Sequence, residues 1–495
     1  MIRYIISIKS VSSDLFNYSA FFRKWVCDTL SLPIDVDRVI SESLRRGAKY
    51  VDVRFQDYFY ELIVIDNGYL REYSVTRSRG IGIRVIINNY VGFASTNIMD
   101  WNSIRETIER AITAAKAMSV AGKIAELAEK PITRAIVRSK YNEDPRNVDS
   151  DTKVKTAMEV NKEALRFNEI KSTVTRMGCQ IDRRVFASSE GDLIDVTTVA
   201  TGVFHLSVAR IANVMERVFD QKSAIAGYEF IERNDWVSFA KEISELAIKA
   251  SQAKTPPPGT YTVVLDNEIV GLLLHEAFGH ASEGDGVEAG ASVLVNKINK
   301  RVASPLITIV DSGVVKGGYF CPYDDEGVPK KKTIVVDKGI LKTYLHSRIT
   351  AKRLGGAPTG NARAQDYASI PLVRQTNYYI EPGDYKVDEL FEDVKFGIYV
   401  KGRGATGGEV DSAVGTFTFS VGPSYLITKG EISELVRGVV LSGLILETLK
   451  EVDAVANDLK ISTSVFGACG KGGQRVRVGD GGPHIRVRRM VIGGR

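Results

Sequence analysis

The hexapeptide HEAFGH at residues 275–280 brings together three side chains that can carry metal-dependent chemistry. Metallopeptidases often place two histidines four residues apart on a helix, with a glutamate beside the first histidine. Here five steps separate His275 from His280. At about 100° per residue, five steps put two side chains about 140° apart on an α-helix, whereas four steps put them about 40° apart. Both imidazoles can reach one ion only if the helix is distorted between them.

The residues before the motif predict a buried helix. In the stretch DNEIVGLLLHEAFGHASEGD, Asp266 or Asn267 can cap this helix, and the aliphatic residues that follow would bury it. Gly279 directly precedes His280, and glycine tolerates backbone angles that other residues resist. We therefore expect a bend or a π-bulge at Gly279 that brings His280 back beside His275.

Two neutral imidazoles supply two ligands for zinc, and a catalytic zinc takes three protein ligands and a water. Glu276 is placed beside the first histidine, where it would take a proton from this water during attack on a carbonyl. A surface or capping histidine pair is the alternative, and it is the favoured interpretation of an arbitrary pair at this spacing. The glutamate, the apolar helix and a total of only five histidines reverse that preference.

The third ligand does not follow from spacing. Three residues stay open: Cys321 in YFCPYDDEG, Cys469 in FGACGKGGQ and His484 in GGPHIRV. Cys469 lies in a glycine-rich turn, where a thiolate can approach an ion closely. The remaining cysteines and histidines are interpreted as packing or hydrogen-bonding residues, namely Cys27, Cys179, His205 and His346.

Composition excludes several classes of protein. The chain has 495 residues, 44% hydrophobic and 25% charged, which is typical of a globular protein too long for one core. A net charge of +6 does not indicate a nucleic-acid-binding protein. Four well-separated cysteines form no disulfide framework and fit the reducing cytoplasm. No apolar run approaches the roughly 18 residues that span a bilayer, so we expect no membrane association.

The chain divides at the segment KTPPPGTYTVVLD, because three prolines and a glycine cannot continue a helix. We predict an N-terminal appendage at 1–34, an α+β domain at 35–255 and a β-rich catalytic domain at 256–495. The fold class is α+β with two domains, mainly antiparallel sheets with flanking helices. The metal site would lie on the distorted helix of the C-terminal domain.

Periodicity places further elements along the chain. Apolar residues at helical spacing predict helices at 33–50, 101–119, 148–167, 234–252 and 431–449. Short alternating segments between 50 and 95 predict strands, with a hairpin around Asn88 and Asn89. The alternation from 169 to 213 predicts an antiparallel meander.

The chain resembles the TldD/PmbA family of zinc metallopeptidases, and specifically the TldD side, which keeps the metal site. The resemblance covers roughly residues 35 to 495 and is strongest after 256. It rests on HEAFGHASEGD, DDEGVP, PTGNARA, GTFTFSVGPSYLITKGEISELVRGVVLSG and CGKGGQRVRVG, in this order.

This resemblance implies one Zn²⁺ per chain, held by His275, His280 and Cys469, with Glu276 as general base. It implies unfolded or short peptides as substrates, bound through their main chain with low sequence specificity. The implied partner is a metal-free TldE/PmbA-type homologue in a heterodimer, with a homodimer as the alternative. Two other functions stay open: a non-enzymatic modulator of the DNA-gyrase-modulator type, and a zinc amidase that acts on a small molecule.

Overall fold

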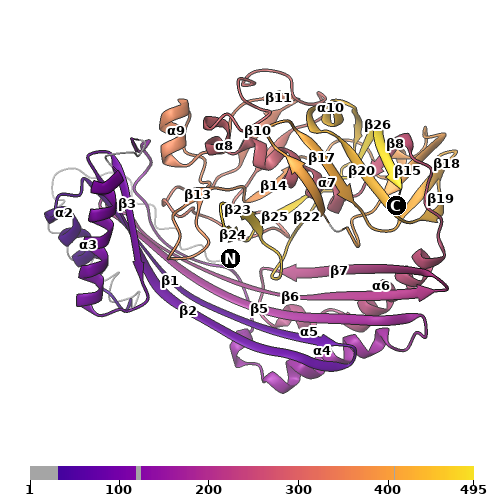
Figure 1. Cartoon of the computed structure of the whole chain (residues 1–495), viewed down its shortest axis with the longest axis horizontal. Coiled ribbons are helices and arrows are strands. Elements are labelled where there is room, and N and C mark those ends of the chain that lie inside the picture. Colours follow the sequence, from indigo (N-terminus) through magenta and orange to yellow (C-terminus); the bar gives the residue numbers. More distant parts are fainter. Residues whose placement is uncertain (1–31, 119–123, 406, 495) are drawn as a thin grey trace.

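The computed structural model describes residues 32–118, 124–405 and 407–494. Cys27 and all but the last three residues of the predicted appendage lie outside these ranges. A long curved sheet forms one layer of the molecule, and the C-terminal half lies against its concave face (Figure 1). The predicted α+β class is confirmed. Within the described ranges, no helix is both long enough and apolar enough to cross a membrane.

The curved sheet consists of long strands in the order β3-β2-β1-β5-β6-β4, with β7 also paired to β6. Its neighbours are antiparallel, except that β4 runs parallel to β6. The strands are β1 (Tyr50–Asp66), β2 (Tyr69–Ile87), β3 (Tyr90–Thr96), β4 (Arg134–Arg138), β5 (Ile170–Ser188), β6 (Leu193–Ile211) and β7 (Val214–Ala224). The short segments predicted between 50 and 87 are in fact two continuous strands, because β1 hydrogen-bonds to β2 on one side and β5 on the other along most of its length.

The predicted hairpin and meander are confirmed. Asn88 and Asn89 connect β2 to β3 with φ angles of 51° and 66°. Asparagine adopts this left-handed region more readily than most residues, which is why it occurs in two-residue hairpin turns. The meander predicted from 169 to 213 consists of β5 and β6.

Four of the five predicted helices are confirmed. They are α2 (Val36–Arg45), α3 (Trp101–Met118), α4 (Ser150–Ala164) and α6 (Trp236–Gln252), and the short α5 (Glu229–Glu232) and 3₁₀ helix η1 (Pro145–Asn147) accompany them. Aspartates 35, 149 and 235 cap three of these helices through their side chains. α2 and α3 pack at one end of the sheet, and α4 and α6 cover its convex face (Figure 1).

The helix predicted at 431–449 is wrong for most of its length. Residues there form β19 (Glu431–Val436) and β20 (Val439–Leu444), and only α10 (Ile445–Lys450) is helical. Gly438, with φ of 65°, turns the chain between the two strands. β20 pairs with neighbours on both sides, and these tertiary hydrogen bonds override the local helical pattern.

Two larger sheets build the C-terminal half. The nine-stranded sheet contains β8 (Gly259–Leu265), β15 (Phe396–Val400), β16 (Gly407–Asp411), β17 (Thr416–Ser420), β18 (Ser424–Thr428), β19, β20, β21 (Val452–Val455) and β26 (Ile485–Gly494). The six-stranded sheet contains β9 (Ile309–Asp311), β10 (Thr333–Asp337), β11 (Ile340–Leu341), β14 (Asn377–Ile380), β22 (Lys460–Thr463) and β25 (Gly479–Gly482). Two ribbons complete the strands: β12 (Ala362–Arg363) with β13 (Leu372–Val373), and β23 (Cys469–Lys471) with β24 (Gln474–Val476).

The helices of this half are short. They are α7 (Asn267–Leu273), the π-helix η2 (Leu274–Gly279), the 3₁₀ helix η3 (His280–Ser282), α8 (Gly284–Glu288), α9 (Arg348–Leu354), η4 (Asp388–Leu390) and α10. A continuous apolar core packs α7 and η2 between the two larger sheets. The domain boundary near residue 255 stays a prediction.

A buried ionic network joins the curved sheet to the C-terminal half. Arg84 on β2 donates to Asp52 on β1 at 2.6 Å and to Glu326 at 2.7 Å. The three side chains are between 0 and 2% exposed. The second oxygen of Glu326 accepts the backbone N–H of Arg348 at 2.7 Å. Because the guanidinium of Arg84 is the cation that both buried carboxylates contact away from water, its removal would leave them without this ion pair.

We predict that Arg84→Ala lowers the free energy of unfolding by about 3–5 kcal/mol, because it leaves two buried carboxylates without their cation. Chemical denaturation measures this loss. Arg79→Ala is the matched control, since Arg79 forms an exposed pair with Asp57 on the same two strands. Its loss should stay below about 1 kcal/mol. Equal losses in the two variants would contradict a stabilising role of the network.

Candidate metal centre

The histidine motif lies on a π-helix. α7 begins after Asp266, whose side chain accepts the N–H of Ile269, and continues directly into η2 (Leu274–Gly279). The N–H of His280 donates to the carbonyl of His275, which is an i→i+5 hydrogen bond. A π turn holds one more residue than an α turn, so residues five apart occupy the positions that residues four apart have on an α-helix. The expected distortion is confirmed, and the two rings lie 5.3 Å apart between centroids.

Gly279 serves this turn for a different reason than expected. Its φ and ψ are −60° and −52°, which any residue adopts in a helix, so backbone freedom is not what the position needs. A Cβ at Gly279 would instead lie 2.1 Å from Oε1 of Gln375. The amide of Gln375 crosses the helix at this point and donates to the carbonyl of His275 at 2.8 Å. The glycine therefore makes room for a side chain that holds the π turn.

Three donor groups from distant segments converge here. His275, His280 and Cys469 each offer one ligand atom, and these atoms lie within 4.8 Å of one another. The Sγ of Cys469 is 3.2 Å from Nε2 of His280. Cys469 is the first residue of β23, and Gly472 and Gly473 turn the chain into β24 with φ angles of 55° and 76°.

Electrostatics favours a thiolate in this cluster. Burial raises the pKa of the Cys469 thiol, but hydrogen bonds to His275 and His280 outweigh burial and lower that pKa to about 5. Burial lowers the pKa of His280, whereas its bonds to Cys469 and Glu283 raise it to about 10. A thiolate is the form that binds a metal, and the imidazolium must release its proton when it becomes a ligand.

Glu276 is less buried than its neighbours on the π-helix. Its side chain is half-buried, whereas Leu274, Ala277 and Phe278 are completely buried. Burial lowers the pKa of His275, but the hydrogen bond to Cys469 and the charges of Cys469, Asp480 and Glu276 raise this pKa above its usual value. Asp480 Oδ2 is 3.9 Å from Nδ1 of His275.

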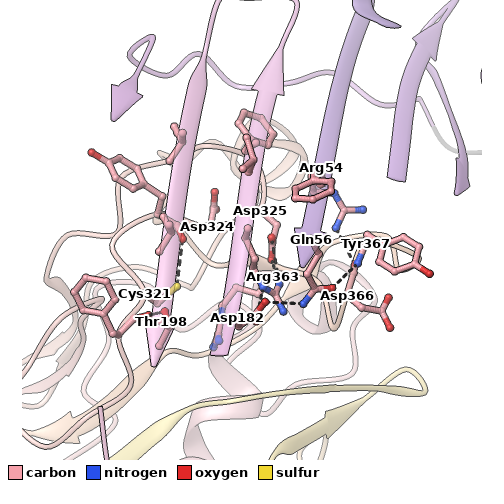
Figure 2. Close-up of a pocket in the computed structure, with 18 of the residues that line it drawn as sticks. Arg54, Gln56, Asp182, Thr198, Cys321, Asp324, Asp325, Arg363, Asp366 and Tyr367 are labelled. Carbon is pink, nitrogen blue, oxygen red and sulfur yellow. Dashed lines mark hydrogen bonds and ion pairs between the residues drawn. The ribbon is translucent and has the colours of Figure 1, made fainter. Parts of the chain in front are cut away.

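Cys321 lies elsewhere. Its Sγ donates to the carbonyl of Tyr323 at 3.3 Å, and burial raises the pKa of this thiol. It lines a pocket of about 60 Å³ together with Arg54 of β1 and Thr198 of β6. Figure 2 shows these three side chains around the pocket. The histidines of the motif and Cys469 do not line this pocket.

The other histidines are occupied by protein partners. His484 hydrogen-bonds to Asp458 at 2.7 Å and to Tyr399 at 2.9 Å. His205 bonds to Thr175 on the neighbouring strand at 2.8 Å, and burial lowers its pKa to about 4. Burial likewise lowers the pKa of His346 to about 4. The structure therefore brings Cys469 to the two motif histidines and places both alternative ligands in other surroundings.

Four residues near the cluster were not singled out from the sequence: Glu283, Gln375, Lys471 and Asp480. Of these four, only Glu283 could have been found from the sequence, because it follows His280 by three residues. Its carboxylate accepts from Nδ1 of that ring at 3.1 Å. Lys471 lies two residues after Cys469 on the same strand, but its two carboxylate partners are more than 180 residues away. Only the tertiary structure connects these groups.

Two imidazoles and a thiol can hold a metal ion, and a carboxylate beside them can act as a general base, so this arrangement can perform metal-dependent hydrolysis. Comparison with known proteins also indicates a metallopeptidase. The family model described as "PmbA/TldA metallopeptidase C-terminal domain" matches residues 258–494, and the model described as "PmbA/TldA metallopeptidase domain 1" matches residues 51–115.

Similar proteins carry related names. A metalloprotease from Methanothermobacter thermautotrophicus is 34% identical over 94% of this chain and 100% of its own length. A protein from Saccharolobus solfataricus named "Zinc metalloprotease TldD homolog" is 32% identical over 92% of this chain and 99% of its own length.

Solved structures share the fold. TldE from Thermococcus kodakarensis superposes with a TM-score of 0.73 at 19% identity, over 93% of this chain and all of that one. A protein from Thermotoga maritima, named as a candidate modulator of a DNA gyrase, superposes with a TM-score of 0.77 at 21% identity, over 92% of this chain and 99% of that one.

The chain therefore belongs to the PmbA/TldD family, and it is a metallopeptidase. The metalloprotease names of these relatives favour an enzyme over the non-enzymatic modulator that the sequence left open.

We predict that Gly279→Ala destabilises the protein by about 1–3 kcal/mol, because the new methyl group overlaps the Gln375 amide. Helix propensity alone predicts the opposite, since alanine is favoured over glycine by about 1 kcal/mol inside helices. Gly286→Ala in α8 is the control, because a Cβ there meets only one atom, at 4.0 Å. Denaturation of both variants measures the difference. A Gly279→Ala variant as stable as Gly286→Ala would refute the close-approach argument.

Proposed function

We propose that His275, His280 and Cys469 hold one Zn²⁺ per chain and that the chain uses this ion to hydrolyse peptide bonds. The observation that carries the proposal is the convergence of three ligand atoms within 4.8 Å, from a helix and a hairpin far apart in the sequence. The name of the Saccharolobus solfataricus relative supports zinc as the ion.

The donor set fits zinc. Two ligands of one tetrahedral zinc lie roughly 3.5 Å apart, given bonds of about 2.0 Å to nitrogen and 2.3 Å to sulfur. The 3.2 Å between Cys469 Sγ and His280 Nε2 is close to that value. The buried Nδ1 of His275 has no hydrogen-bond partner, so this ring is not committed to another group through that atom. Three protein ligands also leave a fourth position for water or substrate, as a catalytic site requires.

When bound, zinc polarises the scissile carbonyl and lowers the pKa of the attacking water. A residue of the chain itself would perform the proton transfers. The Glu276 carboxylate accepts a proton from the attacking water and then delivers this proton to the nitrogen of the leaving amine. Its half-buried position beside His275 keeps the carboxylate close to the reacting atoms while it stays accessible to substrate.

The substrate we propose is an unfolded or short peptide, recognised mainly through its backbone. Among the described strands, β23 pairs with β24 alone, so one edge of the strand that carries Cys469 has no partner strand. An extended peptide can pair with such an edge as an added strand, and main-chain pairing is nearly independent of side-chain identity. Sequence specificity is therefore low.

We also propose that the chain works with a metal-free homologue of the TldE/PmbA type as a heterodimer, with a homodimer as the alternative. The shared fold of TldE supports such a partner. The cytoplasm fits as its location, because the three described cysteines are free thiols. No nucleic acid is expected as a partner at a net charge of +6.

We predict that Cys469→Ser loses most of its zinc, because a hydroxyl is a much poorer zinc ligand than a thiolate. Cys321→Ser is the matched control, since it changes a buried thiol outside the cluster and should keep its zinc. Metal analysis of both purified proteins measures the contents. Equal contents in the two variants would refute the assignment of Cys469.

Glu276→Gln should retain zinc and lose peptide hydrolysis by about 10²–10⁴-fold, because the amide cannot accept the proton. The two readouts are metal content and the rate of cleavage of an unstructured peptide. A zinc-loaded Glu276→Gln enzyme with wild-type rates would exclude this residue as the general base.

A single substrate protein, presented folded and denatured, tests the proposed specificity. We expect cleavage of the denatured form only, because a folded protein exposes an extended segment only after local unfolding. Mass spectrometry of the products distinguishes a peptidase from a small-molecule amidase, and chelation of the metal is the control. Equal rates on both forms, or cleavage at one strict side-chain motif, would contradict backbone recognition.

A further inference from the structure

Glu283 holds a central position among the groups that surround the cluster. It follows η3, and its side chain is 1% exposed. Its Oε2 accepts from Nδ1 of His280 at 3.1 Å and from Nζ of Lys471 at 2.7 Å. Its Oε1 accepts from the backbone N–H of Gln375 at 3.2 Å. One buried carboxylate thus contacts the π-helix segment, the cysteine hairpin and the segment that precedes β14.

The contact with His280 orients the imidazole. When Nδ1 donates its proton to a carboxylate, the neutral ring carries its lone pair on Nε2. Nε2 is the atom that faces Cys469 Sγ at 3.2 Å. Carboxylates that accept from a ligand histidine fix its tautomer and its ring orientation, and they increase its basicity.

The contact with Lys471 positions the third donor. Lys471 is two residues from Cys469 on β23, and its Nζ also donates to Asp285 at 2.6 Å and to the carbonyl of Val373 at 3.0 Å. Arg374 adds a bond of 2.6 Å to the carbonyl of Cys469. These contacts attach a three-residue strand with a glycine turn to the rest of the site. A hairpin of this size has little core of its own, so its position depends on them.

We propose that Glu283 is a positioning residue that sets two of the three donors at once, the His280 ring directly and the Cys469 hairpin through Lys471. This inference rests on the proposed zinc assignment. It goes beyond that assignment because it makes the assembly of the site depend on one carboxylate that does not bind the ion.

Zinc affinity tests the inference without any activity measurement. Glu283→Gln keeps the size of the side chain and removes its charge, while Lys471 retains Asp285 as a partner. We expect a 10–100-fold weaker zinc affinity in competition with a chelator, as is typical when the partner of a ligand histidine is lost. Asp285→Asn is the matched control, because it removes the other carboxylate partner of Lys471 and leaves His280 and Glu283 together. Its affinity should stay within about twofold of wild type.

Lys471→Met separates the two effects of Glu283. Lys471 is partly exposed, so the variant should fold even if Glu283→Gln does not. With Co²⁺ in place of zinc, we expect a weaker thiolate-to-cobalt absorption band in Lys471→Met, because the hairpin loses the three contacts of the Lys471 ammonium while His280 keeps Glu283. Thermal unfolding of the metal-free proteins controls for a general loss of structure.

The outcomes distinguish the inference from the proposed function. If wild type binds no zinc, or if Cys469→Ser leaves the cobalt band unchanged, the zinc assignment itself fails. If wild type binds zinc and Glu283→Gln binds it equally well, the zinc assignment stands and the positioning role is overturned. A wild-type cobalt band in Lys471→Met would overturn the coupling through the hairpin. A loss in Asp285→Asn as large as that in Glu283→Gln would overturn the specific role of Glu283.

Discussion

The candidate site depends on one hydrogen bond, in which the N–H of His280 donates to the carbonyl of His275. On an α-helix, the same two side chains would point about 140° apart. The π turn removes this divergence, and the Gln375 amide supports it by donating to the same carbonyl. A side chain at position 279 would overlap the amide of Gln375, so the glycine is needed for this contact. The π turn and the segment between β13 and β14 therefore constrain each other's position.

The π turn is held in place by the apolar core around it. α7 and η2 bury Leu273, Leu274 and Phe278 in the core between the two larger sheets. Cores of this kind are packed as densely as crystals, so the histidine positions have little freedom. The Cys469 hairpin is different, because it consists of two three-residue strands and a glycine turn. Its position comes from polar contacts with distant segments rather than from a core of its own. The site thus combines a rigid pair of histidines with a thiol that is held by ionic and hydrogen-bond contacts.

The curved sheet contacts the C-terminal half through buried polar side chains. The network around Arg84 joins β1 and β2 to the segment at Glu326 and, through that carboxylate, to the start of α9. Arg477, which follows β24, donates to Gln180 on β5 at 3.1 Å. The hairpin that carries the thiol is therefore in contact with the concave face of the sheet.

Local sequence determined a large part of this protein. Helix periodicity predicted α2, α3, α4 and α6, and the asparagine pair predicted the β2–β3 hairpin, because these features depend on neighbouring residues. The five-residue spacing also predicted a distorted helix, since no regular helix brings both imidazoles together. The order of short motifs indicated the family, which the comparisons then showed.

Tertiary structure decided the rest. The segment at 431–449 forms strands because β20 finds hydrogen-bond partners on both sides, which no local pattern reveals. Spacing alone left Cys321, Cys469 and His484 open as the third ligand, and the family resemblance implied Cys469. The fold brings Cys469 to His280 across 189 residues. The roles of Gln375 and Glu283 have the same origin. Spacing along the chain shows which side chains share one face of a helix. Metal-ligand side chains from separate segments come together only when the sheets pack against each other.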